Sequence, residues 1–350
     1  MSTVILTGGG TAGHCTPNLA LIPYLRNDFE KIFYIGSENG IEKKLAENAG
    51  LEYYGVPCAK LSRSFTPENF AIPFKVFSGV RKAGAILDRL RPDVVFSKGG
   101  YVALPVVIAA KKRKIPVVAH ESDYSPGLAN RISARYCKKV LTSFPETAKD
   151  FKNGEYVGSP VRDGIFGVPK DRALAFFGLT GEKPVLLVTG GSLGAQAINA
   201  AVSDALKELL PRYDIIHICG KGNLPEEKPQ GGYRVYEFLD RMEYAFACAD
   251  ACVTRAGANS LFEIMSLKIP AVLIPLPKGA SRGDQILNAK YFQKCGLAYV
   301  LDQSALTAES LVFAVNSVYS NRFNLRRNSE KHPVKSANRE ISRIIADYKR

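Results

Sequence analysis

The chain has 350 residues, of which 46% are hydrophobic and 23% charged, and it carries a formal net charge of +14 at pH 7. These fractions exclude a largely disordered chain, and the length favours two domains over one. The charge indicates an anionic partner, which leaves nucleic acid, anionic lipid and phosphorylated substrates open. The seven cysteines form no CxxC pair and are expected to be reduced, buried thiols. No apolar run approaches about 20 residues, so we expect neither a membrane-spanning helix nor a signal peptide.

Strands and helices are expected to alternate through the first half of the chain. This pattern is typical of a parallel sheet covered by helices. A stretch rich in glycine and proline at residues 158–169 is the candidate linker. The expected strands are residues 4–7, 31–35, 93–97, 115–119 and 139–142, and the expected helices are residues 16–26, 40–48 and 74–90.

Two glycine-rich loops follow expected strands in this half. GGGTAG at residues 8–13 has the GxGxxG spacing of a dinucleotide-binding fingerprint, and SKGGY stands at residues 97–101. Glycines let the backbone approach phosphate oxygens, and the N-terminus of a following helix offers free N–H groups. Phosphate binding is therefore the favoured interpretation, and tight turns without a ligand are the alternative.

Candidate acid–base residues lie beside these loops. His14 follows the first glycine loop and is a candidate general base, because a histidine side chain titrates near neutral pH. A histidine that only caps or packs against a helix is the alternative. HESD at residues 120–123 ends another expected strand. The carboxylate of Glu121 or Asp123 is expected to orient a substrate hydroxyl or to support the base.

The alternation restarts after the linker, and VTGG at residues 188–191 repeats LTGG at residues 6–9. Two doubly wound α/β units in tandem are therefore predicted. A last helix carries apolar residues at helical spacing, and its Lys- and Arg-rich face is expected to be solvated rather than to bind nucleic acid. The expected strands are residues 185–189, 214–219, 233–238, 251–254 and 271–274, with a helix at residues 195–210.

The second half also holds loops suited to a nucleotide sugar. GGSLG at residues 190–194 is a further glycine loop. Glu263 follows TRAGANS at residues 254–260, where a carboxylate can accept hydrogen bonds from both ribose hydroxyls. The alternative is that Glu263 only interacts favourably with the helix dipole. Asp284 and Gln285 lie in a polar loop and are candidates for contacts with sugar hydroxyls.

No Asp-x-Asp sequence follows an expected strand, so no metal site is expected. Without a metal, positive groups and helix ends must stabilise a leaving diphosphate. Arg162, in the linker, is the candidate for this role.

Residues 63–82 mix aromatic side chains with cations and are interrupted by two prolines. Such a segment is typical of an interfacial membrane anchor, and an apolar face buried in the core is the alternative. The expected membrane contacts are Phe70, Ile72, Phe74, Lys75, Phe77 and Arg81.

Taken together, these motifs resemble those of the MurG-type transferases, which attach N-acetylglucosamine (GlcNAc) to undecaprenyl-diphospho-muramoyl-pentapeptide (lipid I) and so make lipid II. The resemblance covers essentially the whole chain. The matching segments are residues 8–14, 97–101, 120–123, 158–162, 190–194, 219–222 and 255–263, with Gln285, Asn288 and Ala289.

The resemblance implies a GT-B fold in the α/β class. In this fold two tandem Rossmann-like, doubly wound parallel-sheet domains face an interdomain cleft, and a C-terminal helix returns to the first domain. Residues 1–160, completed by the helix at 333–350, would bind the acceptor and the membrane. Residues 161–332 would bind the UDP-sugar donor.

The resemblance also implies roles for single residues. His14, Glu121 and Asp123 would be catalytic. Arg162 and Ser192 would hold the diphosphate, Glu263 the ribose, the Leu239 backbone the uracil ring and Gln285 the GlcNAc. The acceptor would contact Gly9, Gly10, Thr11, Gly99, Gly100 and Tyr101. The donor would contact Thr11, Ala12, Gly13, Asp123, Arg162, Ser192, Leu239, Ala258, Asn259, Ser260, Leu261, Phe262, Glu263 and Gln285.

The implied reaction is an inverting, metal-independent transfer of GlcNAc from UDP-GlcNAc to the 4-hydroxyl of the muramoyl sugar of lipid I. It would need no cofactor or nucleic acid, and the protein would be peripheral at the cytoplasmic face of a bacterial membrane with an anionic surface. The chain departs from the family in Asp123, where many members have Asn, in Asp284, where many have Gln, and in lacking Trp.

Four other functions remain open at this point. Two share the fold: a non-hydrolysing UDP-GlcNAc 2-epimerase and a diacylglycerol glucosyltransferase. The others are a NAD-dependent oxidoreductase and a non-catalytic lipid-binding protein. An assay with UDP-GlcNAc, a lipid I analogue and EDTA would discriminate among them.

Overall fold

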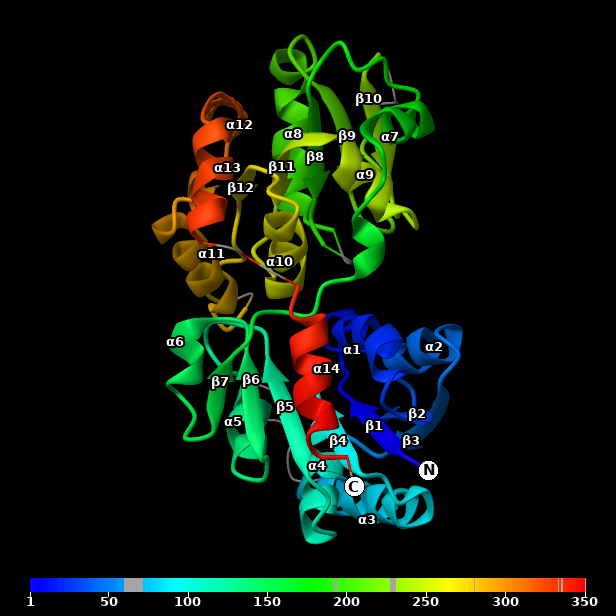
Figure 1. Cartoon of the computed structure of the whole chain (residues 1–350). Coiled ribbons are helices and arrows are strands. Elements are labelled where there is room, and N and C mark those ends of the chain that lie inside the picture. The colour runs from blue at the N-terminus through cyan, green and yellow to red at the C-terminus, as the bar shows by residue number, and fades with distance from the viewer. Residues whose placement is uncertain are drawn as a thin grey trace. The chain divides into compact units, whose positions relative to one another are not determined.

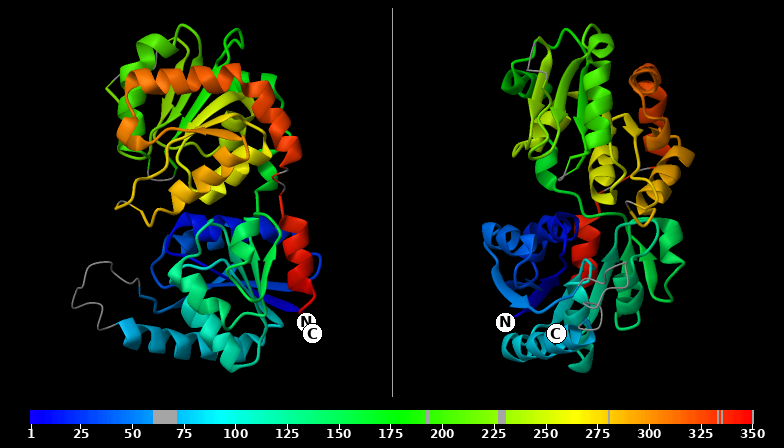
Figure 2. Two further views of the ribbon diagram at one scale, coloured as in Figure 1. Left: turned by 90° about the vertical axis from the view of Figure 1, so that its left-hand side faces the viewer. Right: turned by 180° about the vertical axis from the view of Figure 1, so that it is seen from behind.

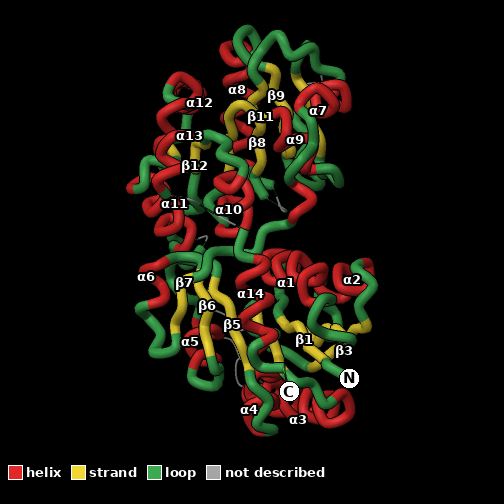
Figure 3. Tube along the Cα trace, in the orientation of Figure 1, coloured by secondary structure: helices red, strands yellow, loops and turns green. Residues whose placement is uncertain are grey.

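The computed structural model describes residues 1–59, 72–191, 194–226, 231–279, 281–332, 334 and 336–349. Contacts divide the chain into two compact units, a first unit of Met1–Val161 with Ser336–Arg350 and a second unit of Arg162–Lys335. Within each unit, strands alternate with helices along the chain (Figure 3).

The first unit contains a seven-stranded sheet in the order β3-β2-β1-β4-β5-β6-β7, and every neighbouring pair is parallel. The strands are β1 (Thr3–Thr7), β2 (Lys31–Ser37), β3 (Glu52–Val56), β4 (Val94–Ser97), β5 (Val117–Glu121), β6 (Lys139–Thr142) and β7 (Gly154–Tyr156). The helices are α1 (Ala12–Leu25), α2 (Ile41–Asn48), α3 (Ile72–Leu90), α4 (Ala103–Lys112), α5 (Leu128–Ala134), α6 (Pro145–Ala148) and α14 (Asn338–Ala346).

Both faces of this sheet are buried, which explains why its central strands are apolar except at their ends. Val4 and Leu6 of β1 pack in one cluster with α1 and α14, and Ile5 packs in another with α3 and α4. Helix α14 lies beside α1 (Figure 1), and its Ile341, Ile344 and Ile345 are fully buried. The expected return of the C-terminal helix to the first unit is therefore confirmed.

The second unit contains a six-stranded sheet in the order β10-β9-β8-β11-β12-β13, again parallel throughout. Helices α8 (green) and α12 (orange) lie beside each other against this sheet (Figure 2). Residues of both helices share one buried cluster with its strands. The strands are β8 (Val185–Thr189), β9 (Asp214–Ile218), β10 (Tyr233–Tyr236), β11 (Ala249–Thr254), β12 (Ala271–Leu273) and β13 (Ala298–Val300). The α-helices are α7 (Lys170–Phe177), α8 (Gln196–Leu209), α9 (Met242–Cys248), α10 (Ala258–Ser266), α11 (Asp284–Lys294), α12 (Ala308–Ser320) and α13 (Arg322–Lys331), and the 3₁₀ helices are Asp163–Ile165 and Gln303–Ala305.

The ten predicted strands are all present, with ends within two residues of those predicted. The prediction missed β3, β7 and β13, which are short strands at the sheet edges; β3 and β7 also mix polar and apolar residues. It also began the first helix at residue 16, whereas α1 begins at Ala12. The glycines before it obscured this start, since glycine weakens a helical pattern.

Candidate functional site

The two glycine loops of the first unit lie side by side because β1 and β4 are neighbours. Thr7 at the end of β1 is in register with Ser97 at the end of β4, and the Lys98 amide donates to the Thr7 carbonyl over 2.8 Å. A Cβ atom on Gly100 would collide with the Gly9 carbonyl, and one on Gly10 would collide with the Tyr101 ring. These glycines are therefore needed for loop-to-loop packing as well as for any ligand.

His14 lies in the first turn of α1, as predicted, and is half-buried. Its imidazole packs over the second glycine loop, with Cδ2 at 3.1 Å from the position of a Cβ on Gly100. Thr11, the N-cap residue of α1, is exposed and makes no side-chain capping hydrogen bond. His14, Thr11, Gly100 and Tyr101 thus come together at the carboxyl ends of β1 and β4.

A buried carboxylate that the sequence interpretation overlooked supports the first loop. Glu42, in the first turn of α2, is 0% exposed and accepts hydrogen bonds from the amides of Gly10 (3.3 Å) and Ser37 (3.0 Å) and from the Ser37 hydroxyl. From the sequence, the position of Glu42 in a first helical turn suggests only a favourable interaction with the helix dipole. Its contact with Gly10 depends on the fold, so no local pattern could have revealed it.

Glu121 is buried at the end of β5, and both of its oxygens are engaged. They accept hydrogen bonds from the Asp123 amide (3.0 Å), the Gly127 amide (3.0 Å) and the Asn130 side-chain amide (2.8 Å). Glu121 therefore shapes the loop that follows β5. Asp123 lies in that loop, is half-buried, and is the more exposed of the two carboxylates.

A buried chain of hydrogen bonds joins the ends of β4 and β5. Lys98 Nζ lies 2.9 Å from His120 Nδ1 and donates to the Ser122 hydroxyl. His120 Nε2 lies 2.9 Å from the Gly158 carbonyl, which can only accept, so Nε2 carries the proton and Nδ1 accepts from Lys98. Burial lowers the pKa of Lys98 to about 8, against the opposing effect of Glu121 and Asp123. Burial and the Lys98 charge likewise hold the pKa of His120 well below its usual range.

In the second unit, the glycine loop after β8 packs on the loop after β9. A Cβ on Gly194 would collide with the Cys219 carbonyl, and Asn199 of α8 donates to that same carbonyl over 2.9 Å. His217 Nε2 lies 3.0 Å from Oδ1 of the Asn199 side chain, and this second contact holds the Asn199 amide in place against the Cys219 carbonyl. Ser192, a predicted donor contact, lies outside the described residues.

Helix α10 begins at Ala258 after β11, with Gly257 as its N-cap residue, so its first-turn amides lie at the carboxyl end of the sheet. Asn259 and Ser260 are half-buried there. The side chains of Leu261 and Phe262 are buried in the core, as is that of Leu239. These three predicted donor contacts can therefore offer only backbone atoms.

Glu263 forms a bidentate ion pair with Arg162, both residues belonging to the second unit. Arg162 Nε lies 2.7 Å from Glu263 Oε1, and a terminal nitrogen lies 3.2 Å from Oε2. Burial lowers the pKa of Arg162, but the hydrogen bond and charge of Glu263 outweigh it, so the net shift is upward. The sequence predicted both residues but not their pairing.

Gln285 connects the loops that follow β11 and β12. Its Oε1 accepts hydrogen bonds from the amides of Ala256 (3.3 Å) and Leu276 (3.1 Å). Asn288, one turn further along α11, donates to the Ala256 carbonyl over 3.1 Å. With its oxygen occupied, Gln285 is left with its Nε2 donors for a ligand.

Comparison with known proteins gives the family. The glycosyltransferase family 28 N-terminal domain matches residues 4–142, and the family 28 C-terminal domain matches residues 185–344. The UDP-N-acetylglucosamine–N-acetylmuramyl-(pentapeptide) pyrophosphoryl-undecaprenol N-acetylglucosamine transferase of Lachnoclostridium phytofermentans is 48% identical over 326 residues, which are 92% of each chain. The transferase of the same name from Clostridium botulinum (strain Langeland) is 44% identical over 352 residues, 99% of each chain.

The chain belongs to the MurG family of glycosyltransferases. The crystal structure of Acinetobacter baumannii MurG is 26% identical, covers 99% of this chain and 100% of its own, and has a TM-score of 0.76. The predicted GT-B fold, with two tandem parallel-sheet units, is thereby confirmed.

In this MurG-family chain, the candidate anchor helix α3 exposes its N-terminal aromatic residues. Phe74 is 78% exposed and Phe77 is 69% exposed, so these two side chains are not part of the core. Lys75 and Arg81 are also exposed, and Ile72 is half-buried. Phe70 lies outside the described residues. No helix in the described part of the chain is both long and apolar enough to cross a membrane.

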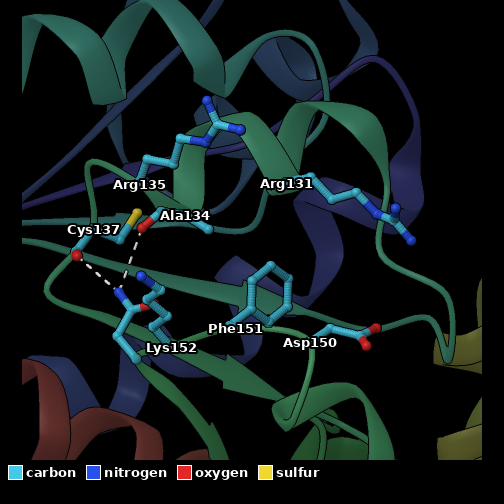
Figure 4. A pocket seen from close by; sticks show the side chains of 8 residues that line it. Arg131, Ala134, Arg135, Cys137, Asp150, Phe151 and Lys152 are labelled. Atoms are coloured by element: carbon cyan, nitrogen blue, oxygen red, sulfur yellow. Dashed lines mark hydrogen bonds between the residues drawn. The ribbon is translucent and has the colours of Figure 1, made fainter.

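A cavity of about 540 Å³ opens elsewhere in the first unit of this MurG-family chain (Figure 4). Asn153 donates across it to the carbonyls of Cys137 (2.8 Å) and Ala134 (3.4 Å). Cys137 precedes β6 and Asn153 precedes β7, so the cavity lies at the amino ends of the strands and apart from His14 and Asp123. The predicted site residues do not line it.

Proposed function

We propose that the chain transfers GlcNAc from UDP-GlcNAc to lipid I and so makes lipid II. The observation that carries the proposal is the full-length match to transferases named for this reaction. The loops at the carboxyl ends of both parallel sheets support it, because ligands of open α/β sheets bind outside those ends.

The donor is proposed to bind the second unit. The amides of the first turn of α10 would bind the diphosphate, since a helix N-terminus favours anions. Gln285 would donate from Nε2 to an oxygen of the GlcNAc. The backbone of Leu239 would contact the uracil ring, and Ser192, outside the described residues, would contribute to the diphosphate site.

Donor binding is proposed to open the Arg162–Glu263 ion pair. Glu263 would accept hydrogen bonds from the ribose hydroxyls, and the guanidinium of Arg162 would bind the diphosphate. The two groups are adjacent, with Arg162 Nε 2.7 Å from Glu263 Oε1. The exchange therefore replaces one set of charge-assisted hydrogen bonds with another.

The acceptor is proposed to bind the first unit at the two packed glycine loops, with His14 or Asp123 as the base. Glu121 is less suited to proton transfer, because its two oxygens already accept three hydrogen bonds. His14 is half-buried at the loop junction and is our first choice. The acceptor would contact Gly9, Gly10, Thr11, Gly99, Gly100 and Tyr101.

The proposed reaction is a single displacement. The base takes the proton of the muramoyl 4-hydroxyl, whose oxygen forms a bond to the anomeric carbon while the bond from that carbon to UDP breaks. Attack on the face opposite UDP inverts the configuration and gives a β link. Arg162 and helix N-termini would stabilise the leaving diphosphate in place of a metal ion.

The reaction is proposed to take place at the cytoplasmic face of a bacterial membrane, with the protein held peripherally. The exposed Phe74 and Phe77 support this location, because aromatic residues flanked by cations suit an anionic interface.

A transfer assay with radiolabelled UDP-GlcNAc and a lipid I analogue tests the function. We expect a labelled lipid product in the presence of EDTA, with formation dependent on both substrates. Conversion of UDP-GlcNAc to its 2-epimer without acceptor, or transfer to diacylglycerol in place of lipid I, would contradict the proposal. Loss of activity with EDTA and its recovery with Mg²⁺ would contradict the metal-independent mechanism alone.

A further inference from the structure

The acceptor side of the first unit contains a buried cation to which the transfer mechanism assigns no role. Lys98 is 1% exposed at the carboxyl end of β4, directly before Gly99 and Gly100. A buried ammonium is costly unless it is paired and hydrogen-bonded. The groups that pair with the Lys98 ammonium therefore indicate its role.

The titratable groups around Lys98 come from β5 and the loop after it. His120 accepts a hydrogen bond from Nζ, and the carboxylates of Glu121 and Asp123 interact with the ammonium electrostatically. Across Gly8, α1 approaches with the His14 carbonyl and the uncharged Asn18 amide. His120 is neutral, so Lys98 is the positive charge that faces the two carboxylates.

These carboxylates create a difficulty for an acceptor that carries a diphosphate. Two negative charges beside the glycine loops would repel an anion and weaken its binding. A buried opposite charge reduces that repulsion and is little screened by salt, because it is out of water. Asp123, which replaces the neutral Asn of many family members, makes this compensation more necessary.

We propose that Lys98 is a positioning residue for the transfer reaction. It holds the Ser122–Asp123 segment through Ser122 and His120, and it balances the carboxylates of Glu121 and Asp123 so that an anionic acceptor can bind beside them. The inference rests on the proposed function, because the acceptor is taken to be a diphosphate.

The test measures kcat/KM for a lipid I analogue between pH 6 and 9.5 in the full-length protein. Lys98→Met keeps the aliphatic stem and removes the charge and the hydrogen bonds. We expect kcat/KM for the acceptor to fall by about 10²-fold, the size of loss associated with a misplaced reacting group. KM for UDP-GlcNAc should stay unchanged. Lys44→Met, at an exposed position on α2, is the matched control and should behave as wild type.

The pH profile separates charge from simple structural support. The wild type should lose acceptor kcat/KM above a pH of about 8, where Lys98 gives up its proton, and Lys98→Met should lack that decline. Ser122→Ala removes one acceptor of the ammonium, so it should move the decline to lower pH. If Lys98→Met fails to fold, Ser122→Ala still tests the proposal. A decline of acceptor kcat/KM at the same pH as in wild type would overturn it.

A double-mutant cycle tests the partner. In the Asp123→Asn background, Lys98→Met should lower kcat/KM for the acceptor by less than about threefold, because one of the two negative charges that Lys98 balances has been removed. If the fold-losses of kcat/KM in the two single variants simply multiply in the double variant, the inference is overturned. An inactive wild type would instead remove the proposed function, so the two failures are distinguishable.

Discussion

At the scale of single residues, His14 and Asp123 compete for the role of general base. We expect His14→Ala to lower kcat by about 10²–10⁴-fold with little change in UDP affinity, because a general base acts on the acceptor and not on the nucleotide. Steady-state kinetics with saturating donor measure this. Near-normal kcat in His14→Ala, with a collapse in Asp123→Asn, would transfer the assignment to Asp123.

The Arg162–Glu263 ion pair leads to a second prediction at this scale. In Arg162→Ala, Glu263 no longer has its partner, so uridine, which has a ribose but no phosphate, should bind at least as tightly as to wild type. UDP should bind more weakly by about 1–3 kcal/mol, because a charged hydrogen bond to the diphosphate is lost. Calorimetric competition measures both affinities. A parallel loss for uridine and UDP would mean that the pair does not open on binding.

Local sequence patterns pointed to some residues of the candidate site and not to others. His14 and Glu263 could be named as candidates from the sequence, because each lies directly after a strand-end loop with a recognisable pattern; their roles stay predictions. Glu42 and Lys98 could not be assigned a role. Their partners, Gly10 and His120, lie 32 and 22 positions away, and only the sheet order brings them together.

At the scale of elements, the sequence predicted the strands well wherever both sheet faces are buried. Such strands are continuous apolar runs, as in VLLVT of β8. The missed edge strand β3, EYYGV, is largely half-buried and mixed in character. Helix α3 had two open interpretations, since its apolar spacing fits either a core face or an anchor. Only the exposure of Phe74 and Phe77 in the folded unit separates them.

Helix α3 provides the prediction at this scale. Replacing Phe74 and Phe77 with Ser should remove the part of vesicle binding that persists at high salt, while leaving UDP affinity unchanged. Each nearby cation contributes about 1 kcal/mol of salt-sensitive attraction to anionic lipid. Sedimentation with phosphatidylglycerol vesicles at low and high salt measures both parts.

Phe313→Ser is the matched control for that experiment, because Phe313 is 65% exposed but belongs to α12 in the second unit. It should leave vesicle binding unchanged. Equal binding by the α3 variant and wild type at high salt would mean that the anchor lies elsewhere.

At the scale of the whole molecule, the buried thiols link stability to alkaline pH. Burial raises the pKa of Cys15 to about 11 and of Cys248 to about 12, from an ordinary value near 9. The thiols stay protonated when folded but ionise when unfolded. Their stabilising effect is thus complete below pH 9 and is lost as pH rises towards 11–12.

The free energy of unfolding should therefore fall by about 1 kcal/mol per buried thiol by pH 10. Urea denaturation at pH 8 and pH 10 under reducing conditions measures the change. Cys248→Ala should reduce the dependence on pH. An unchanged slope in that variant would show that this thiol does not contribute.

The chain leaves the first unit and re-enters it at adjacent points. Ser159 pairs with Ser336 in a parallel bridge. Asn338 accepts a hydrogen bond from the Val161 amide and donates one to the Val161 carbonyl. Topologically, the second unit is thus an insert spliced into a host fold. Replacing residues 162–335 with about four glycines, enough to cover the short gap, should give a host that folds cooperatively with α14 docked. A molten product would show that the host depends on its insert.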